Sequence, residues 1–237
     1  MNLKNKRVLV TGGAVRIGES ICRIFASHGS KIIIHYNNSE KEALKLFDSM
    51  GGKDKGHILT KGNLTSDKYI NSLISSLGQI DILINNASIF ECKTLINEDI
   101  TSAKHQFETN FWAPFNLMQQ FRKQNLDNGL IINILDRRIN TFDSNHGSYL
   151  LSKKSLADAT KLAALQWAPS TRVNGIAPGF VLPPPWMPNS TMQKSISLTP
   201  LKKSVNLDEI AKACVFLAES DSITGEIIMI DGGLHLL

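Results

Sequence analysis

Two side chains that could move a proton, Tyr149 and Lys153, lie four residues apart in a segment whose sequence is typical of a helix. At that spacing both side chains lie on one face of a helix. A nearby ammonium favours the charged form of a phenol, so we expect Lys153 to lower the pKa of Tyr149. Asp136 follows the apolar run 130–135, which Asn133 interrupts, and a strand end could deliver its carboxylate to the same pair. These residues predict a proton-transfer site.

A second candidate site is the glycine-rich segment 11–18, Thr-Gly-Gly-Ala-Val-Arg-Ile-Gly, between the first predicted strand and the first predicted helix. Glycines there permit a tight turn and a close approach of the backbone to a pyrophosphate, and the helix amino terminus offers free N–H groups to the anion. We expect Gly12, Ile17 and Gly18 to contact a dinucleotide. The alternative is a glycine-rich turn without a ligand.

The end of the second predicted strand indicates which dinucleotide is bound. NAD sites usually place an acid there to hold the ribose hydroxyls, but here the first acid is Glu40, inside the next helix. Arg16 in the glycine turn could stack over adenine and pair with a 2′-phosphate. The residues that could add contacts at the strand end are Tyr36, Asn37, Asn38 and Ser39. This set favours NADPH, whereas a solvated loop charge is the alternative interpretation of Arg16.

Apolar runs alternate with amphipathic segments along the whole chain. Short, almost wholly apolar strands are typical of a parallel sheet covered on both faces, and their alternation with helices gives right-handed crossovers. Predicted strands cover residues 7–11, 31–36, 57–61, 81–85, 130–135, 171–176 and 226–230. Predicted helices cover residues 17–28, 40–50, 67–77, 98–124, 149–167 and 207–219. The pattern predicts an α/β fold, a doubly wound parallel sheet of about seven strands flanked by helices, in a single domain spanning residues 1–237.

Local signals refine this arrangement. Pro114 falls inside the predicted helix 98–124 and should kink or divide it. Two residue pairs have the spacing of a capping box, Ser39 with Glu42 and Asn206 with Glu209. The segment 178–204 contains six prolines and is long for a connection, so we expect a loop that closes over a substrate. A structural crossover or a subunit contact is the alternative role for it.

Composition excludes several classes of protein. The net charge of +5 comes from scattered basic residues, whereas a nucleic-acid-binding protein usually concentrates them on one face. Three cysteines lie far apart, which predicts no metal site and a reduced, cytoplasmic setting. No apolar run approaches the roughly 18 residues of a membrane span. We therefore expect a cytoplasmic protein that binds a small molecule and neither nucleic acid nor a membrane.

In combination these motifs resemble the short-chain dehydrogenase/reductase family, and the resemblance covers essentially the whole chain. The motifs that carry it are the glycine turn 11–18, Asn85-Asn86-Ala87, Asn110, Tyr149-x-x-x-Lys153 and Pro178-Gly179. Within the family the chain looks most like the pteridine reductases. That likeness rests on Arg16, the segment 35–39 with the sequence His-Tyr-Asn-Asn-Ser, Ser88, Phe90 and Asp136. The resemblance implies a Rossmann-type fold and commonly a homotetramer, with the long helices 98–124 and 149–167 at one interface.

The resemblance also implies roles for individual residues. Tyr149 would be the proton donor, Lys153 would hold it at a lowered pKa and bind the nicotinamide ribose, and Asp136 would assist. Asn110 would bind a water on the proton path to Lys153. Further cofactor contacts would come from Asn63, Leu64, Asn86, Ala87, Ser88, Pro178 and Gly179. The substrate would contact Ser88, Phe90, Asp136, Tyr149 and Trp186, with Phe90 stacked on a flat ring.

Two positions depart from the usual family pattern. Most members have a serine where this chain has Asp136, and an ionised carboxylate only accepts hydrogen bonds. It suits the N–H groups of a pterin better than a ketone oxygen. The alternative is that Ser144 or Ser148 serves as the usual serine. Asn63 stands where an aspartate usually contacts adenine, and its amide oxygen keeps an acceptor there.

The sequence therefore predicts an NADPH-dependent reductase of a pterin, such as dihydrobiopterin, dihydromonapterin or dihydrofolate. Two alternatives stay open. One is a carbonyl or 3-ketoacyl reductase of the same family, and the other is a non-catalytic protein that senses NADPH. A short substrate panel separates them.

Overall fold

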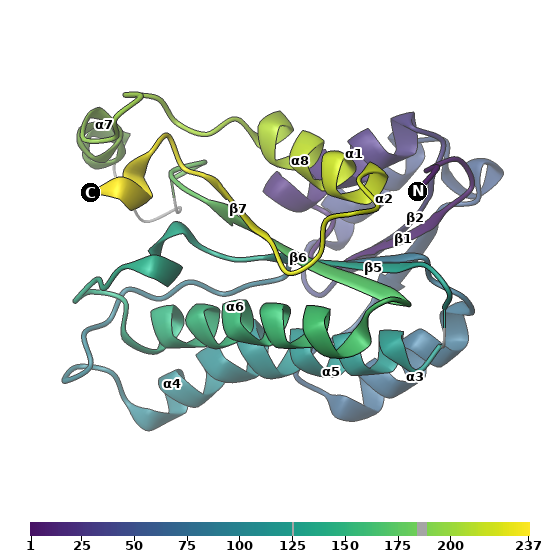
Figure 1. The fold of residues 1–237 in the computed structure, drawn as a ribbon, viewed down its shortest axis with the longest axis horizontal. Helices are drawn as coiled ribbons and strands as arrows, with labels where there is room; N and C mark the ends of the chain where they lie inside the picture. Colours follow the sequence, from purple (N-terminus) through teal and green to yellow (C-terminus); the bar gives the residue numbers. More distant parts are fainter. Residues whose placement is uncertain (125, 184–188) are drawn as a thin grey trace.

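The chain forms one parallel sheet with helices packed on both faces (Figure 1). The computed structural model describes residues 1–124, 126–183 and 189–237. Within them the sheet has seven strands in the order β3-β2-β1-β4-β5-β6-β7, all paired in parallel. The strands are β1 (Arg7–Val10), β2 (Lys31–Tyr36), β3 (Ile58–Lys61), β4 (Ile82–Asn85), β5 (Gly129–Ile134), β6 (Thr171–Pro178) and β7 (Ile227–Ile230). The predicted fold class is confirmed.

The helices divide into two layers because most of them bury an apolar stripe on one face of the sheet. One layer holds α1 (Arg16–Ser27), α2 (Glu40–Ser49) and α8 (Leu207–Glu219), and it lies above the sheet in Figure 1. The other layer lies below the sheet and holds α3 (Asp67–Leu77), α4 (Ile100–Phe107), α5 (Ala113–Arg122) and α6 (Gly147–Trp167). None of the described helices combines the length and the apolar character needed to cross a membrane.

The strand order reverses between β1 and β4, which are neighbours in the sheet although two strands separate them in sequence. In doubly wound sheets, ligands bind outside the carboxyl ends of the strands at such a switch point. The glycine turn follows β1, the Asn85–Asn86 segment follows β4, and Asp136 follows β5. The topology therefore brings the three predicted motifs to one edge of the sheet.

The polar residue in the middle of β5, Asn133, is fully buried and hydrogen-bonded on both sides. Its amide oxygen accepts from Asn85 Nδ2 at 2.8 Å, and its own Nδ2 donates to the Thr160 hydroxyl at 2.8 Å. Thr160 in turn donates to Leu156 O at 2.7 Å. This chain of bonds joins β4, β5 and α6, so it ties the helix that carries Tyr149 to the centre of the sheet.

The predicted helix 98–124 is divided, as Pro114 indicated. A π-helical segment, η2 (Glu108–Trp112), separates α4 from α5, and Pro114 lies in the first turn of α5, where its missing N–H costs nothing. Asn110 lies within the π-helical segment. Such segments are frequent at functional sites.

Two local predictions differ from the structure. The segment 178–204, predicted as a loop, contains a helix, α7 (Asn189–Ser197), whose Met192 and Ile196 are buried at helical spacing. Asn206 and Glu209 form the predicted capping box, whereas the prediction for Ser39 is wrong. Ser39 has φ −87° and ψ 55°, away from the extended conformation that lets a capping side chain reach the helix N–H groups.

Candidate active site

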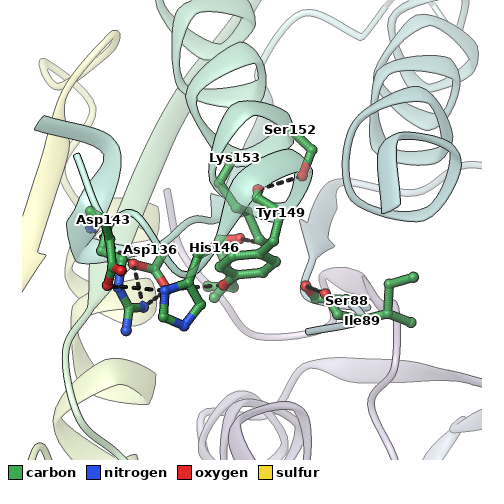
Figure 2. A network of polar contacts seen from close by, with 10 residues as sticks. Ser88, Ile89, Asp136, Asp143, His146, Tyr149, Ser152 and Lys153 are labelled. Carbon is green, nitrogen blue, oxygen red and sulfur yellow. Dashed lines mark hydrogen bonds and ion pairs between the residues drawn. The ribbon is translucent and has the colours of Figure 1, made fainter. Parts of the chain in front are cut away.

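Asp136 and Tyr149 meet at the carboxyl edge of the sheet. Asp136 begins the short turn η3 (Arg137–Asn140) directly after β5, and Tyr149 lies in the first turn of α6. The Tyr149 hydroxyl donates to Asp136 Oδ2 at 2.9 Å (Figure 2). Of the alternative serines, Ser144 is exposed, and Ser148 donates its backbone N–H to Glu98 Oε2 at 2.8 Å. Asp136, the strand-end carboxylate, is therefore the group that contacts the tyrosine.

Lys153 lies one turn beyond Tyr149 and is buried. Its ammonium donates to Ile134 O at 2.9 Å, at the end of β5. Burial lowers the pKa of Lys153 to about 8, against the opposing effect of the Asp136 charge. Burial and the adjacent Asp136 carboxylate raise the pKa of Tyr149 well above its ordinary value. The expected lowering of the Tyr149 pKa is not found in this arrangement, because the phenol is buried and a carboxylate adjoins it.

Phe90 forms an aromatic wall beside Tyr149. Its ring meets the Tyr149 ring edge-on, with centroids 4.7 Å apart and planes at 87°. His146 stacks on Phe90 with centroids 5.1 Å apart and planes at 28°. Phe90 thus lies between His146 and Tyr149, and its role as a stacking surface for a flat substrate stays a prediction.

Asn110 holds the loop that carries Ser88. Its side chain is buried, its oxygen accepts from the Ser88 hydroxyl and the Ile89 N–H, each at 2.9 Å, and its Nδ2 donates to Ile89 O at 3.0 Å. The predicted residues Asn110 and Ser88 are thus brought together. The side chain acts on this loop, and a role in binding water stays a prediction.

Thr11 connects the glycine turn to the segment after β4. Its hydroxyl oxygen accepts from the N–H groups of Asn86 at 2.9 Å and Ala87 at 3.0 Å. Asn86 Nδ2 donates to the carbonyl oxygens of Thr11 and Gly12 at 2.9 and 3.0 Å. A Cβ on Gly18 would collide with Gly12 O and lie 2.7 Å from Asn86 Nδ2. The backbone at Gly18 is packed too closely to admit a side chain. The backbone of the glycine turn therefore forms a smooth cradle.

The amino terminus of α1 lies at this cradle. The residue that precedes the helix, Val15, makes no side-chain capping bond. The helix's free N–H groups and positive dipole end suit a phosphate. Gly12 has φ +59°, a left-handed conformation that favours glycine. Ile17 packs against the apolar core beneath the turn. The cradle and the uncapped helix therefore fit a dinucleotide.

Arg16 is exposed and has φ +54°, a strained value for a residue with a side chain. Its Nη2 donates to Leu182 O at 2.9 Å, in the segment after β6. Arg16 thus joins the glycine turn to the predicted substrate loop. Trp186, the loop residue predicted to contact substrate, lies outside the described residues.

The end of β2 presents mainly neutral groups. Tyr36 is buried against Ala14, whereas Asn37 and Asn38 are exposed and Ser39 is half-buried. The first acid, Glu40, forms an ion pair of 2.8 Å with Lys61. Register places Lys61 of β3 opposite Tyr36 and so brings a cation to this edge.

Four further predicted contact residues lie at or just after strand ends. Asn63 uses its side-chain oxygen to accept from Thr65 N at 3.0 Å, and Leu64 is buried in the core. Pro178 is the last residue of β6, and Gly179 N donates to Ile230 O at 2.8 Å. A Cβ on Gly179 would lie 2.7 Å from Asp231 Cα, so this turn also requires glycine.

Three residues of the site were not predicted from the sequence. Arg138 forms ion pairs with Asp136 at 3.1 Å and with Asp143 at 2.9 Å. His146 Nδ1 lies 3.0 Å from Asp143 Oδ2, without the alignment of a hydrogen bond. Figure 2 shows Asp136, Asp143 and His146 on one side of Tyr149 and Ser88 on the other. Their positions shortly before Tyr149 were the available signal.

Comparison with known proteins assigns the family. The family model described as Enoyl-(Acyl carrier protein) reductase matches residues 13–235. Glucose and ribitol dehydrogenase homolog 2 from Arabidopsis thaliana is 31% identical over 98% of this chain and 86% of its own length. The 3-oxoacyl-(acyl-carrier-protein) reductase FabG from Thermotoga maritima is 29% identical over 99% of both chains.

Among solved structures, FolM alternative dihydrofolate reductase 1 from Brucella suis in complex with NADP is similar to this chain. It is 34% identical, with a TM-score of 0.93 over 100% of this chain and 97% of that one. The family model, the relatives and the dinucleotide cradle agree. The chain therefore belongs to the short-chain dehydrogenase/reductase family and is an NAD(P)-dependent reductase.

Proposed function

We propose that this protein is an NADPH-dependent reductase of a pterin, of the dihydrobiopterin, dihydromonapterin or dihydrofolate class. The observation that carries the proposal is the hydrogen bond from the Tyr149 hydroxyl to the Asp136 carboxylate. It pairs a proton donor with an acceptor at the edge of the sheet where ligands bind. The similarity to an alternative dihydrofolate reductase supports the same substrate class.

The chemistry of Asp136 favours a nitrogen heterocycle. An ionised carboxylate accepts hydrogen bonds and donates none, so it pairs well with ring N–H and amino groups and poorly with a ketone oxygen. One edge of a pterin ring carries such donors. Phe90, whose ring meets the edge of Tyr149, would supply an aromatic surface for the flat ring, and offset stacking adds about 0.5–1.5 kcal/mol beyond burial.

In this mechanism NADPH supplies the hydride. Tyr149 remains protonated at neutral pH because its pKa is raised, so it is ready to donate a proton to the reduced ring. Asp136 fixes the direction of the hydroxyl and accepts from the ring. Lys153 anchors the first turns of α6 to β5 and binds the cofactor ribose. Asn110 holds the loop carrying Ser88, which closes the opposite side of the site.

The preference for NADPH rests on the charges in the glycine turn and at the end of β2. The phosphate-bearing cofactor needs cations and no free acid near the adenine ribose. Arg16 lies in the glycine turn, and the carboxylate of Glu40 is paired with Lys61. Asn37 and Asn38 are exposed there and add neutral donors.

The test is a substrate panel with purified protein. NADPH consumption is measured with dihydrobiopterin, with dihydrofolate, and with a simple ketone and a 3-ketoacyl thioester. The proposal expects turnover of a pterin and preference for NADPH over NADH. Turnover of the ketone or thioester with indifference to pterins contradicts it.

A carbonyl or 3-ketoacyl reductase is the second candidate, favoured by the 29% identity to FabG over 99% of both chains. The same panel decides between the two. Binding of NADPH without turnover of any substrate would instead indicate the sensing role.

We also propose a single domain that assembles as a homotetramer. Trp112 and Leu162 are exposed, at 49% and 55%, on the neighbouring helical segments η2 and α6, where a partner subunit would cover them. Light scattering of the purified protein gives the mass of the assembly and tests this directly.

A further inference from the structure

Arg138 joins two carboxylates beside Tyr149. Its Nη1 lies 3.1 Å from Oδ2 and 3.3 Å from Oδ1 of Asp136, and its Nε donates to Asp143 Oδ2 at 2.9 Å. The side chains of Arg138 and Asp136 are each only 12% exposed. A guanidinium held at two points away from bulk water is far more restrained than one in a surface ion pair.

The two oxygens of Asp136 have different partners. Oδ2 accepts from the Tyr149 hydroxyl, and Oδ1 accepts from the backbone N–H of Arg138 at 2.9 Å. The guanidinium spans both oxygens from one side. Rotation of the carboxylate would break bonds to the backbone and the guanidinium together, so the direction of Oδ2 toward Tyr149 depends on Arg138.

We propose that Arg138 is a positioning residue for the reduction: its guanidinium holds the Asp136 carboxylate in line with the Tyr149 hydroxyl, and Asp143 holds the guanidinium. The proposal rests on the proposed function in one respect, namely that Asp136 and Tyr149 act as the proton-transfer pair. Arg138 itself acts through Asp136.

Asp143 holds the Arg138 guanidinium in place. Its Oδ1 accepts from Asn145 N at 3.0 Å while its Oδ2 takes Arg138 Nε. Burial opposes its charge, but the Asn145 N–H, the neighbouring His146 and the Arg138 charge outweigh that effect and lower the pKa of Asp143 to about 2. It therefore stays ionised across the working range of pH.

The network closes into a ring of side chains. His146, beside Asp143, stacks on Phe90, and Phe90 meets the edge of Tyr149. The Arg138 guanidinium lies 6.0 Å from the centroid of Phe90. Each member is thus held by neighbours on two sides. The charged or titratable side chains around Asp136 are Arg137, Arg138, Asp143, His146, Tyr149 and Lys153.

Arg137 provides a matched control. It belongs to the same turn and carries the same charge, but its guanidinium lies over the Phe180 ring, 5.1 Å from the centroid. If the turn acted on the site only through its positive charge, replacing either arginine would have the same effect. A positioning role makes only Arg138 matter, because only it contacts the carboxylate in the described structure.

The first measurement needs no substrate. The chain has three tyrosines, so labelling only their Cζ atoms with carbon-13 gives three resonances, and Tyr149→Phe assigns the one of interest. Asp136→Asn gives the position of that resonance without the carboxylate. We expect Arg138→Gln to move the Tyr149 resonance toward the Asp136→Asn position, Arg138→Lys to move it less, and Arg137→Gln to leave it in place.

The second measurement is steady-state kinetics with a dihydropterin and with a simple carbonyl. We expect Arg138→Gln to lower kcat by about 10–100-fold, because a small misplacement of a catalytic group costs this much. KM for NADPH should stay unchanged, and Arg138→Lys should recover part of the loss. If the wild type reduces only the carbonyl, the pterin proposal fails, while the carbonyl assay and the resonance still test Arg138.

Asp143→Asn is a second variant that tests the proposal even if Arg138→Gln does not fold. It keeps the Arg138 charge and weakens its anchor, so it should change the resonance and kcat in the same direction by a smaller amount. Arg138→Gln or Asp143→Asn with the parental resonance and kcat overturns the proposal. So does a change in only one of the two readouts, or an equal effect of Arg137→Gln.

Discussion

The Tyr149 hydroxyl donates a 2.9 Å hydrogen bond to Asp136 Oδ2, and this contact determines which form of the tyrosine the site holds. Burial and the adjacent negative charge both disfavour the phenolate, so the pKa of Tyr149 is raised well above its ordinary value. A protonated phenol with a fixed direction is a proton donor. The site is therefore arranged for reduction at neutral pH.

Tyr149→Phe removes the proton donor and little else, since the ring and its contact with Phe90 remain. We expect kcat to fall by about 10²–10⁴-fold, the usual contribution of a general acid. Binding of NADPH, followed by fluorescence titration, should be unchanged. Tyr69→Phe, which removes a hydroxyl bonded to Thr60, is the control. A parental rate in the Tyr149 variant would refute the assignment.

Asp136→Ser should change substrate preference more than overall activity. Serine can donate to a ketone oxygen, whereas a pterin N–H loses its ionic partner. Because an unmatched polar group costs about 1–3 kcal/mol, we expect the ratio of pterin to carbonyl kcat/KM to fall by about tenfold or more. Asp158→Ser, which removes an exposed carboxylate from the same helix as Tyr149, should leave the ratio unaltered. An unchanged ratio in both variants argues against Asp136 as the selective group.

Arg16→Gln should reduce the preference for NADPH. A hydrogen bond to a charged group contributes about 1.5–3 kcal/mol, so kcat/KM for NADPH should fall by about tenfold or more while that for NADH changes little. Arg23→Gln, from the same helix and paired with Glu19, is the control. An equal loss with both cofactors would show that Arg16 acts mainly through its bond to Leu182.

The lowered pKa of the buried His35 predicts how the free energy of unfolding depends on pH. Burial lowers its pKa to about 4, while a bond to Gly62 O acts in the opposite direction. The unfolded chain binds the proton near the ordinary value, so between pH 6.5 and 4 it holds more protons than the folded chain. Stability should fall as pH is lowered through this window, by about 3 kcal/mol in full.

Urea unfolding at the two ends of that window measures the effect. His35→Gln, whose amide can take over the bonds to Gly12 N and Gly62 O, should lose most of the pH dependence. His28→Gln, at an exposed position, should retain it. The same acid sensitivity in the His35 and His28 variants would assign it to other groups.

The sequence was sufficient for the sheet, because most of its strands are short, largely apolar segments that alternate with helices. It also predicted that Asp136 and Tyr149 approach each other, since a strand end and the next helix share an edge of the sheet. The helix α7 was missed because Asn189–Ser197 is rich in serine and threonine and follows several prolines. Only the burial of Met192 and Ile196 at a spacing of one turn indicates it.

The hydrogen-bond acceptor of Lys153 could not be predicted in the same way. Spacing places Lys153 on the same face as Tyr149, but it does not say which acceptor the ammonium reaches. In the folded chain that acceptor is Ile134 O, and the carboxylate is the neighbour of the phenol. Arg138 could not be predicted for a related reason, since a basic pair in a loop is usually solvated and only the tertiary structure shows that Arg138 pairs with Asp136.

The buried bonds of Asn133 have a consequence for the evolution of this site. A leucine there would fill the sheet centre with apolar contacts, but it would leave Asn85 Nδ2 without the partner it has now. It would also remove the hydrogen bond to Thr160, one of the contacts that hold α6 in register with β5. Substitution of Asn133 should therefore be constrained by the alignment of the helix that carries Tyr149 as well as by packing.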